Sequence, residues 1–295
     1  MTKYIILGHE NPDVDSIVSG YIYQNYLQRR NIDAEFIIPD EKIEDDTLEI
    51  CRQFNLEPTT FQKKLEYNKD TKFILVDHHN RKEIENIELI IDHHLDEHEP
   101  DTTNCVNEPS SSTSCLIVQE NEAFYSIHEI ELACMAAMVD TASFHSTKGK
   151  EWDLKWIEKM VKEKNLDFNK LYNAGLSIND ISNPKDVMFH GLKKHEINGH
   201  KVESSTIHVN GMTNNWKKIN EIVNLLQKHT ANSEIDYFLF IIHDMDKFET
   251  WLYTFNKEGY RRKKYHEYTS RGTTIIPELE EELKYTPKQK VKTDH

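Results

Sequence analysis

Short apolar runs alternate with segments of helical spacing through the first half of the chain, and this alternation most constrains its fold. Strands are predicted at residues 4–7, 35–38, 73–76 and 89–91, and helices at residues 16–30, 47–54 and 131–139. Runs rich in Ile, Val and Phe are typical of parallel strands that are buried on both faces. The alternation therefore predicts an α/β domain with a mainly parallel sheet, which binds ligands at the carboxyl ends of its strands.

The second half of the chain has a different pattern. Residues 179–186 are rich in turn-forming Asn, Asp, Ser and Pro. Beyond them, strands are predicted at residues 200–209, 237–243 and 250–255, with one helix at residues 216–229. We therefore predict a first domain at residues 1–180, a linker at 181–187, and a smaller α+β domain at 188–295.

Aspartate and histidine side chains follow three of the predicted strands, and a further aspartate ends a predicted helix. They are His9, Asp13 and Asp15; Asp77 and His78; Asp92, His93 and His94; and Asp140. One aspartate would be enough to cap a helix, and closely packed carboxylates repel each other unless a cation neutralises them. Carboxylates and imidazoles without thiolates suit Mn²⁺, Co²⁺ or Mg²⁺ better than structural zinc. The ligands exceed the needs of one tetrahedral ion and favour a two-metal site, which can activate water for phosphoryl transfer.

The charge and the apolar pattern of the chain exclude several classes of protein. With 36 basic and 51 acidic residues, the net charge is −15, which argues against a general nucleic-acid surface, including one for duplexes. The sequence has neither an apolar stretch of membrane-spanning length nor the pattern of a secretory signal. Its four cysteines are far apart and are expected as free thiols. These features predict a cytoplasmic protein with no membrane partner.

The strand-end motifs resemble those of the DHH phosphoesterase superfamily, and within it the manganese-dependent (family II) inorganic pyrophosphatases. GHENPDVDS at residues 8–16 is similar to that family's GHxNPDTDS, VDHHN at 76–80 to VDHNE, and DHH at 92–94 is the superfamily signature. EPSSSTS at 108–114 resembles EPVGCTA, and VDTASFHS at 139–146 resembles SDTLLFKS. In the second half of the chain, residues 192–199, which include Lys193, resemble the family's DxKxF segment and the turn after it, and TSRGTTIIPEL at 269–279 resembles SRKKQVVPPL. The resemblance extends over nearly the whole chain.

This resemblance implies that the domain at residues 1–180 is catalytic, that the domain at 188–295 binds the substrate, and that the active site lies in the cleft between them. It also implies a role for each matching residue. One metal ion would be held by His9, Asp13 and Asp77, and a second by Asp15, His93 and Asp140, with Asp77 bridging the two. The nucleophile would be a water or hydroxide between the ions, and His78 would serve as a general acid or as a neighbour of the ligands. Phosphate oxygens would be contacted by His94, Lys193 and Arg271. The substrate would be a small phosphoanhydride, most simply pyrophosphate, and the chain would form a homodimer as family members often do.

The chain also departs from the family pattern. Gly272 and Thr273 stand where the family has two lysines, which should weaken the binding of a highly charged anion. The basic run 261–264 lies close by in the sequence, but it is interpreted as the solvated face of a helix. His79 stands where the family has asparagine, and it is expected to donate or accept a hydrogen bond near the metal ligands.

Three alternatives to pyrophosphate hydrolysis stay open. An exopolyphosphatase would share both domains but usually has asparagine at the position of His9. A phosphodiesterase of oligonucleotides or cyclic dinucleotides would carry a GGGH motif, which this sequence lacks. The third alternative is a metal- or nucleotide-binding regulatory protein that has lost turnover. Its only support is the altered segment at residues 270–274.

Overall fold

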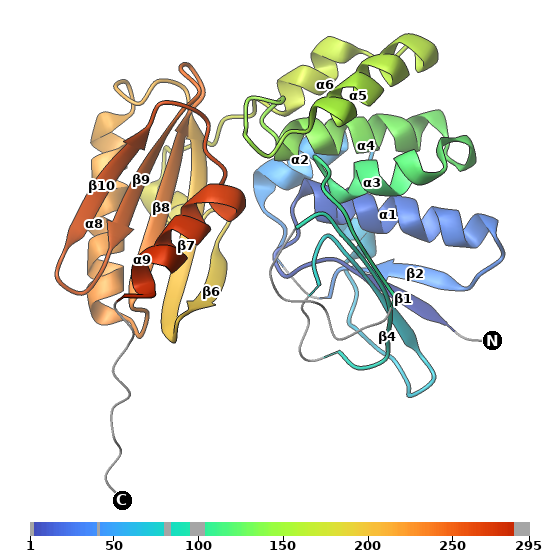
Figure 1. Ribbon diagram of the computed structural model, residues 1–295, viewed down its shortest axis with the longest axis horizontal. Helices are drawn as coiled ribbons and strands as arrows, with labels where there is room; N and C mark the ends of the chain where they lie inside the picture. Colours follow the sequence, from blue (N-terminus) through green and yellow to red (C-terminus); the bar gives the residue numbers. More distant parts are fainter. Residues whose placement is uncertain (1–2, 40–41, 80–83, 95–103, 286–295) are drawn as a thin grey trace, which may run out of the picture. The chain divides into compact units, whose positions relative to one another are not determined.

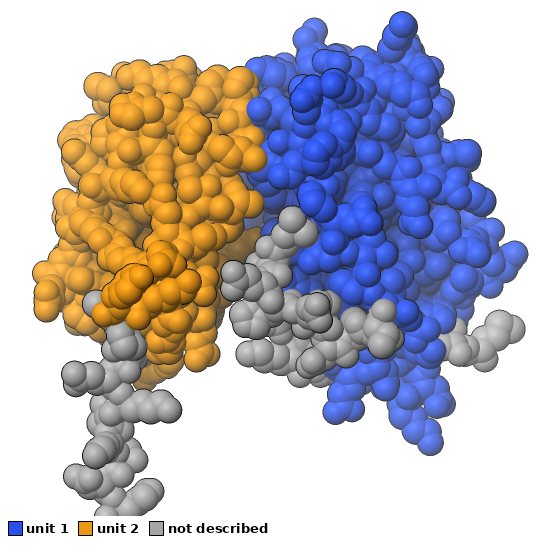
Figure 2. Space-filling view, viewed as in Figure 1, with its two compact units in different colours: residues 1–144, 148–177 blue, residues 145–147, 178–295 orange. Residues whose placement is uncertain are grey.

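The computed structural model describes residues 3–39, 42–79, 84–94 and 104–285. The chain divides into two compact units: unit 1 comprises residues 1–144 and 148–177, and unit 2 comprises residues 145–147 and 178–295 (Figure 2). The stretch predicted as a linker, residues 181–187, contains the short helix α7 (Pro184–Val187). None of the described helices combines the length and the apolar character that a membrane span requires.

Unit 1 is built on a five-stranded parallel sheet with the order β2-β1-β3-β4-β5 (Figure 1). The strands are β1 (Tyr4–Leu7), β2 (Ala34–Ile37), β3 (Lys72–Val76), β4 (Ile87–Asp92) and β5 (Cys105–Asn107). Because β2 and β3 lie on opposite sides of β1, the chain reverses its direction of travel across the sheet there. The carboxyl ends of β1 and β3 therefore form a topological switch point, where parallel α/β sheets bind ligands.

Apolar side chains cover both faces of this sheet because successive residues of a strand point to opposite sides. Ile6 and Ile74 belong to the larger core under the helices, whereas Ile5 and Leu75 belong to a smaller core on the other face. Figure 1 shows α1, α3 and α4 stacked on the same side of the sheet. The helices of the unit are α1 (Val14–Arg29), α2 (Asp45–Gln53), α3 (Thr113–Glu120), α4 (Ile127–Asp140), α5 (Glu151–Lys164) and α6 (Phe168–Ala174). The predicted parallel α/β architecture is confirmed.

Unit 2 contains a second five-stranded sheet with the order β10-β9-β8-β7-β6. Strands β7 and β8 are parallel and the other neighbours are antiparallel. The elements are β6 (Lys193–Ile197), β7 (His200–Val209), α8 (Trp216–Asn232), β8 (Tyr237–Asp244), β9 (Glu249–Phe255), β10 (Tyr260–Tyr265) and α9 (Ile276–Leu283). Helix α8 packs on the face that carries Phe238 and Phe240, and α9 packs on the face that carries Leu239 and Ile241. The prediction of a smaller α+β unit is confirmed.

The basic run at residues 261–264 is an edge strand, so its interpretation as the face of a helix is wrong. It forms β10, which pairs antiparallel with β9. On one side of the strand Arg261 forms an ion pair with Glu282, while on the other the guanidinium of Arg262 lies 4.9 Å from the ring centre of Trp251. Consecutive charged residues lack the apolar periodicity that separates a strand from a helix, so only pairing with β9 decides the structure.

Candidate metal centre

The loop after β1 places two potential ligands beside a third from β3. Gly8 fits there because a Cβ at this position would lie 2.1 Å from Oγ of Ser16, which also accepts the backbone N–H of His9 at 3.1 Å. Asp13 caps α1 by accepting the backbone N–H of Ser16 at 3.1 Å. Nε2 of His9 lies 3.3 Å from Oδ2 of Asp13 and 3.5 Å from Oδ2 of Asp77. The tight turn thus brings one imidazole and two carboxylates together.

A second imidazole, that of His93 after β4, faces three carboxylates. Its Nδ1 lies 2.9 Å from the carbonyl oxygen of Ser110. Its Nε2 lies 3.3 Å from Oδ2 of Asp140, 3.5 Å from Oδ1 of Asp77 and 3.9 Å from Oδ2 of Asp15. Asp77 is therefore shared, with one oxygen toward each histidine.

The hydrogen bonds of the two histidines define which nitrogen faces the carboxylates. A carbonyl oxygen only accepts, so Nδ1 carries the hydrogen in His9, where it donates to Glu10 at 2.8 Å, and in His93. Burial, and then the nearby Lys148 ammonium, lower the pKa of His93 to about 4, which leaves its ring neutral at neutral pH. Both Nε2 atoms are buried and have no hydrogen-bond partner in the described part of the chain. A cation between such a nitrogen and the carboxylate oxygens would stabilise the arrangement, so the residues fit a divalent metal ion.

Asp15 and Asp77 carry more negative charge than their buried surroundings favour. Burial raises the pKa of Asp77 well above its usual value, and the carboxylate of Asp15 raises it further. Burial also raises the pKa of Asp15, although its oxygens accept the backbone N–H groups of Thr113 at 2.7 Å and Ser114 at 3.0 Å. These donors belong to the first turn of α3, whose dipole favours a carboxylate there. A bound cation would relieve the remaining repulsion.

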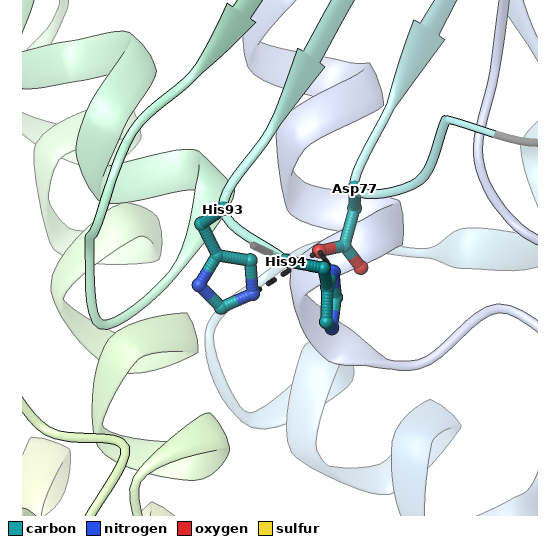
Figure 3. A group of neighbouring side chains, drawn as sticks. All are labelled: Asp77, His93 and His94. Atoms are coloured by element: carbon teal, nitrogen blue, oxygen red, sulfur yellow. Dashed lines mark ion pairs between the residues drawn. The ribbon is translucent and has the colours of Figure 1, made fainter. Parts of the chain in front are cut away.

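Three groups of side chains bring ligand atoms within 4.8 Å of one another in the described part of the chain. The groups are His9, Asp13 and Asp77; Asp15, His93 and Asp140; and Asp77, His93 and His94. Figure 3 shows the third group, in which both imidazoles lie close to the carboxylate of Asp77. Nδ1 of His94 lies 3.8 Å from Asp77 but only 2.8 Å from Oδ1 of Asp92. Because Asp92 engages that nitrogen, the first two groups are better suited to metal ions.

Asp92 organises the histidines around it. Its carboxylate lies 2.8 Å from Nδ1 of His79 and 2.8 Å from Nδ1 of His94, and it accepts the backbone N–H groups of His93 and His94 at 2.8 and 3.1 Å. Burial would raise the pKa of Asp92, but the hydrogen bonds from His79 and His94 hold it far below its usual value. His79 therefore contacts Asp92, which in turn contacts His94. This agrees with the expectation that His79 forms a hydrogen bond near the candidate metal ligands.

Asp140 has a partner that the sequence analysis missed. It is the last residue of α4, where the helix dipole disfavours a negative charge. Lys148 supplies the compensating cation, because its Nζ contacts Oδ2 of Asp140 directly. Burial would raise the pKa of Asp140, but Lys148 and then His93 hold it below its usual value. Nothing in the local sequence around Lys148 signals this contact.

The remaining predicted site residues lie in different places. His78 follows Asp77, and its Nδ1 donates to the carbonyl oxygen of Val76 at 3.0 Å. Lys193 and Arg271 belong to unit 2, where Arg271 donates from Nη1 to the carbonyl oxygen of Gly191 at 2.7 Å. That contact joins the π-helical turn at residues 271–275 to the segment just before Lys193. The two predicted phosphate-binding cations thus lie on neighbouring segments of one unit.

A buried carboxylate that the sequence analysis also missed supports the serine-rich loop. Oδ2 of Asp153 accepts the backbone N–H of Ser111 at 2.6 Å and the hydroxyl of Ser110 at 3.2 Å. Ser112 caps α3 by accepting the backbone N–H of Cys115 at 3.1 Å. These serines hold the loop in place, and through Ser110 they hold the imidazole of His93.

Comparisons with known proteins agree with this arrangement. Residues 3–140 match the model of the DHH family, N-terminal domain. The chain is 24% identical, over 82% of both chains, to a Listeria welshimeri protein named as a probable manganese-dependent inorganic pyrophosphatase. It is 26% identical to a manganese-dependent inorganic pyrophosphatase of Methanothrix thermoacetophila, over 82% of this chain and 81% of the relative.

The fold of the whole chain also has a solved counterpart. A Methanococcus jannaschii protein named as a family II inorganic pyrophosphatase superposes with a TM-score of 0.76 and 22% identity, covering 94% of this chain and 98% of that one. This similarity concerns the fold. Together with the DHH match, it confirms the predicted resemblance to the DHH superfamily and to the family II pyrophosphatases.

Proposed function

We propose that this protein is a hydrolase that cleaves inorganic pyrophosphate to two phosphates with the help of two divalent ions. Mn²⁺ is the preferred ion, with Co²⁺ or Mg²⁺ as substitutes. The names of the relatives support the reaction and the metal. The observation that carries the proposal in this chain is the pair of buried Nε2 atoms, on His9 and His93, that have no hydrogen-bond partner in the described part of the chain and that both face Asp77.

This geometry supports the assignment of two metal groups. His9, Asp13 and Asp77 would hold one ion, and Asp15, His93 and Asp140 the other, with one oxygen of Asp77 directed to each. When bound, such ions supply positive charge to phosphoryl oxygens and lower the pKa of a water molecule. Hydrogen bonds to neighbouring groups fix the orientation of the ligands. The carbonyl oxygens of Glu10 and Ser110 orient the two imidazoles, and the first turn of α3 orients Asp15.

We assign three side chains to the substrate and one to proton transfer. His94 has a side chain that is 32% exposed and an Nδ1 held by Asp92, so its ring is oriented and accessible to a phosphoryl oxygen. Lys193 and Arg271 would bind phosphate oxygens from unit 2, and the planar guanidinium of Arg271 suits two oxygens at once. His78, next to the shared Asp77, would donate the proton that the leaving phosphate takes up.

The test is phosphate release from pyrophosphate by protein that has been stripped of metal and then given Mn²⁺. We expect turnover that depends on Mn²⁺ and falls by at least about 10³-fold in Asp77→Asn. The matched control is Asp70→Asn, because Asp70 is an exposed aspartate of the turn before β3 and lies outside the metal groups. Mn²⁺-independent release, or an Asp77→Asn variant as fast as the Asp70→Asn control, would refute the proposal.

The same assay separates the alternative substrates. Tripolyphosphate and a cyclic dinucleotide replace pyrophosphate in parallel reactions. If the loss of the lysines at positions 272 and 273 has changed the substrate, one of these will be cleaved faster than pyrophosphate. Mn²⁺ binding without cleavage of any of them would favour a regulatory binding protein instead.

A further inference from the structure

Lys148 places a positive charge inside the candidate metal centre. Its Nζ contacts Oδ2 of Asp140, and the two side chains are only 15% and 19% exposed. The same oxygen lies 3.3 Å from Nε2 of His93, the nitrogen that is assigned to a metal ion. A divalent ion held by His93 and Asp140 would therefore compete with the ammonium group for the same carboxylate oxygen.

A strained turn brings Lys148 to this position. After α4, three consecutive non-glycine residues, Ala142, Ser143 and Phe144, have positive φ angles of 49°, 54° and 63°. Left-handed backbone costs about 1–2 kcal/mol for each such residue, so surrounding contacts must hold it. The backbone N–H of Ser143 donates to Met138 at 2.7 Å, and that of Phe144 donates to the hydroxyl of Thr141 at 3.0 Å. The turn reverses the chain, so a residue eight positions after Asp140 returns to it.

The charge of Lys148 opposes a second cation at this place. Two positive charges a few Å apart repel each other strongly where water is largely excluded. The carboxylate of Asp140 also has to divide its electron pairs between the ammonium and the ion. The repulsion and the competition for Asp140 both act most strongly on an ion in the Asp15–His93–Asp140 group. They act more weakly on an ion in the His9–Asp13–Asp77 group, which does not contain Asp140.

We propose that Lys148 is a built-in counter-cation of the Asp15–His93–Asp140 group, which competes with the divalent ion for Asp140 and weakens metal binding there. The inference rests on the metal part of the proposed function and not on its substrate. Lys148 is then a positioning residue. At low metal concentration its ammonium group holds Asp140 in place, and at higher concentration the divalent ion displaces that ammonium group from Asp140. The two metal groups then fill at different Mn²⁺ concentrations.

The test is calorimetric titration of metal-stripped protein with Mn²⁺, checked by the electron paramagnetic resonance signal of free Mn²⁺, with no substrate present. Wild type should show a tight and a weak class of site. In Lys148→Met the weak class should bind at least about tenfold more tightly, since one neighbouring charge commonly shifts a cation equilibrium by a factor of ten or more. Lys148→Arg keeps the charge and should bind like wild type.

Lys150→Met is the matched control, because it removes the same charge from a lysine two residues away whose recorded contact is a backbone hydrogen bond to Ser111. It should leave both classes unchanged. A wild type that binds one ion while Lys148→Met binds two would also support the proposal. Equal affinities in wild type and a folded Lys148→Met, weaker binding in that variant, or no Mn²⁺ binding by either, would overturn it.

Failure of this inference can be told apart from failure of the proposed reaction. If wild type binds Mn²⁺ but releases no phosphate from pyrophosphate, the substrate assignment fails while the competition by Lys148 can still be measured. If pyrophosphate is hydrolysed and Lys148→Met leaves the affinities unchanged, only the role of Lys148 fails.

Discussion

Asp77→Asn should change the stability of the protein in opposite directions without and with metal. In the metal-free protein the Asp77 carboxylate is 2% exposed and accepts one recorded hydrogen bond, from the hydroxyl of Thr113 at 3.1 Å. Its Oδ1 and Oδ2 lie 3.5 Å from the Nε2 atoms of His93 and His9. An asparagine has nearly the same shape, removes the charge, and offers an N–H group to one of these nitrogen lone pairs.

The expected gain in the free energy of unfolding follows from the cost of burying the Asp77 carboxylate. An unsatisfied buried polar group costs about 1–3 kcal/mol, and more if it is charged. Removing that cost should raise the free energy of unfolding of the metal-free protein by about 1–3 kcal/mol. For a unit of this size, 1 kcal/mol corresponds to about 2–4 °C in Tm, so we expect an increase of roughly 2–12 °C.

Saturating Mn²⁺ should reverse the order of the two proteins. An ion at 100 times its Kd stabilises the folded state by about 2.7 kcal/mol for each site, and Asp77 directs one oxygen toward the histidine of each proposed metal group. Wild type therefore gains more from Mn²⁺ than Asp77→Asn does, and it should melt at the higher temperature.

The assay is thermal unfolding followed by circular dichroism, with EDTA and then with Mn²⁺ in excess. Asp153→Asn serves as control, because the buried carboxylate of Asp153 accepts hydrogen bonds at both oxygens. The Asp153→Asn protein should therefore be less stable than wild type in both conditions. A metal-free Asp77→Asn that melts below wild type, or an order that Mn²⁺ does not reverse, would refute the argument that unbalanced charge dominates this site.

Three further predictions follow from the same geometry. Because the pKa of Asp77 is raised in the folded state by burial and neighbouring carboxylates, its contribution is favourable below its unfolded pKa and is lost as pH rises through the folded value. The metal-free protein should thus lose stability between weakly acidic and neutral pH in urea titrations, and Asp77→Asn should flatten that dependence. Gly8→Ala should lower stability by about 1–3 kcal/mol and weaken Mn²⁺ binding in calorimetry, because its Cβ would lie 2.1 Å from Oγ of Ser16; unchanged binding would show that the turn can adjust. His79→Ala should raise the KM for the cleaved phosphoanhydride several-fold with little change in Mn²⁺ affinity, since it removes one of two imidazoles from Asp92; a large loss of Mn²⁺ would instead make His79 a ligand.

Most of the ligand geometry was accessible from the sequence, because the carboxyl ends of parallel strands meet at one edge of a sheet. His9, Asp77 and His93 each follow a strand that its apolar run identifies, and the structure brings all three together. The sequence shows the serine-rich segment 108–114, but it does not indicate that the Ser110 hydroxyl and the Ser111 backbone N–H donate to Asp153. Asp153 lies in α5, 42 positions after Ser111, whose backbone N–H donates to it, and no local pattern of the sequence indicates such a contact.

The sequence by itself determined four of the five strands of unit 1 and the polar side chains that follow them, since burial periodicity and strand-end position are local properties of the chain. The short edge strand β5 (Cys105–Asn107) was not predicted. Only the tertiary structure decided that Lys148 meets Asp140, because a turn of left-handed residues that packing must hold brings them together. Only pairing with β9 made a strand of the basic run at residues 261–264. In both cases the deciding energy comes from contacts between segments that the local sequence does not specify.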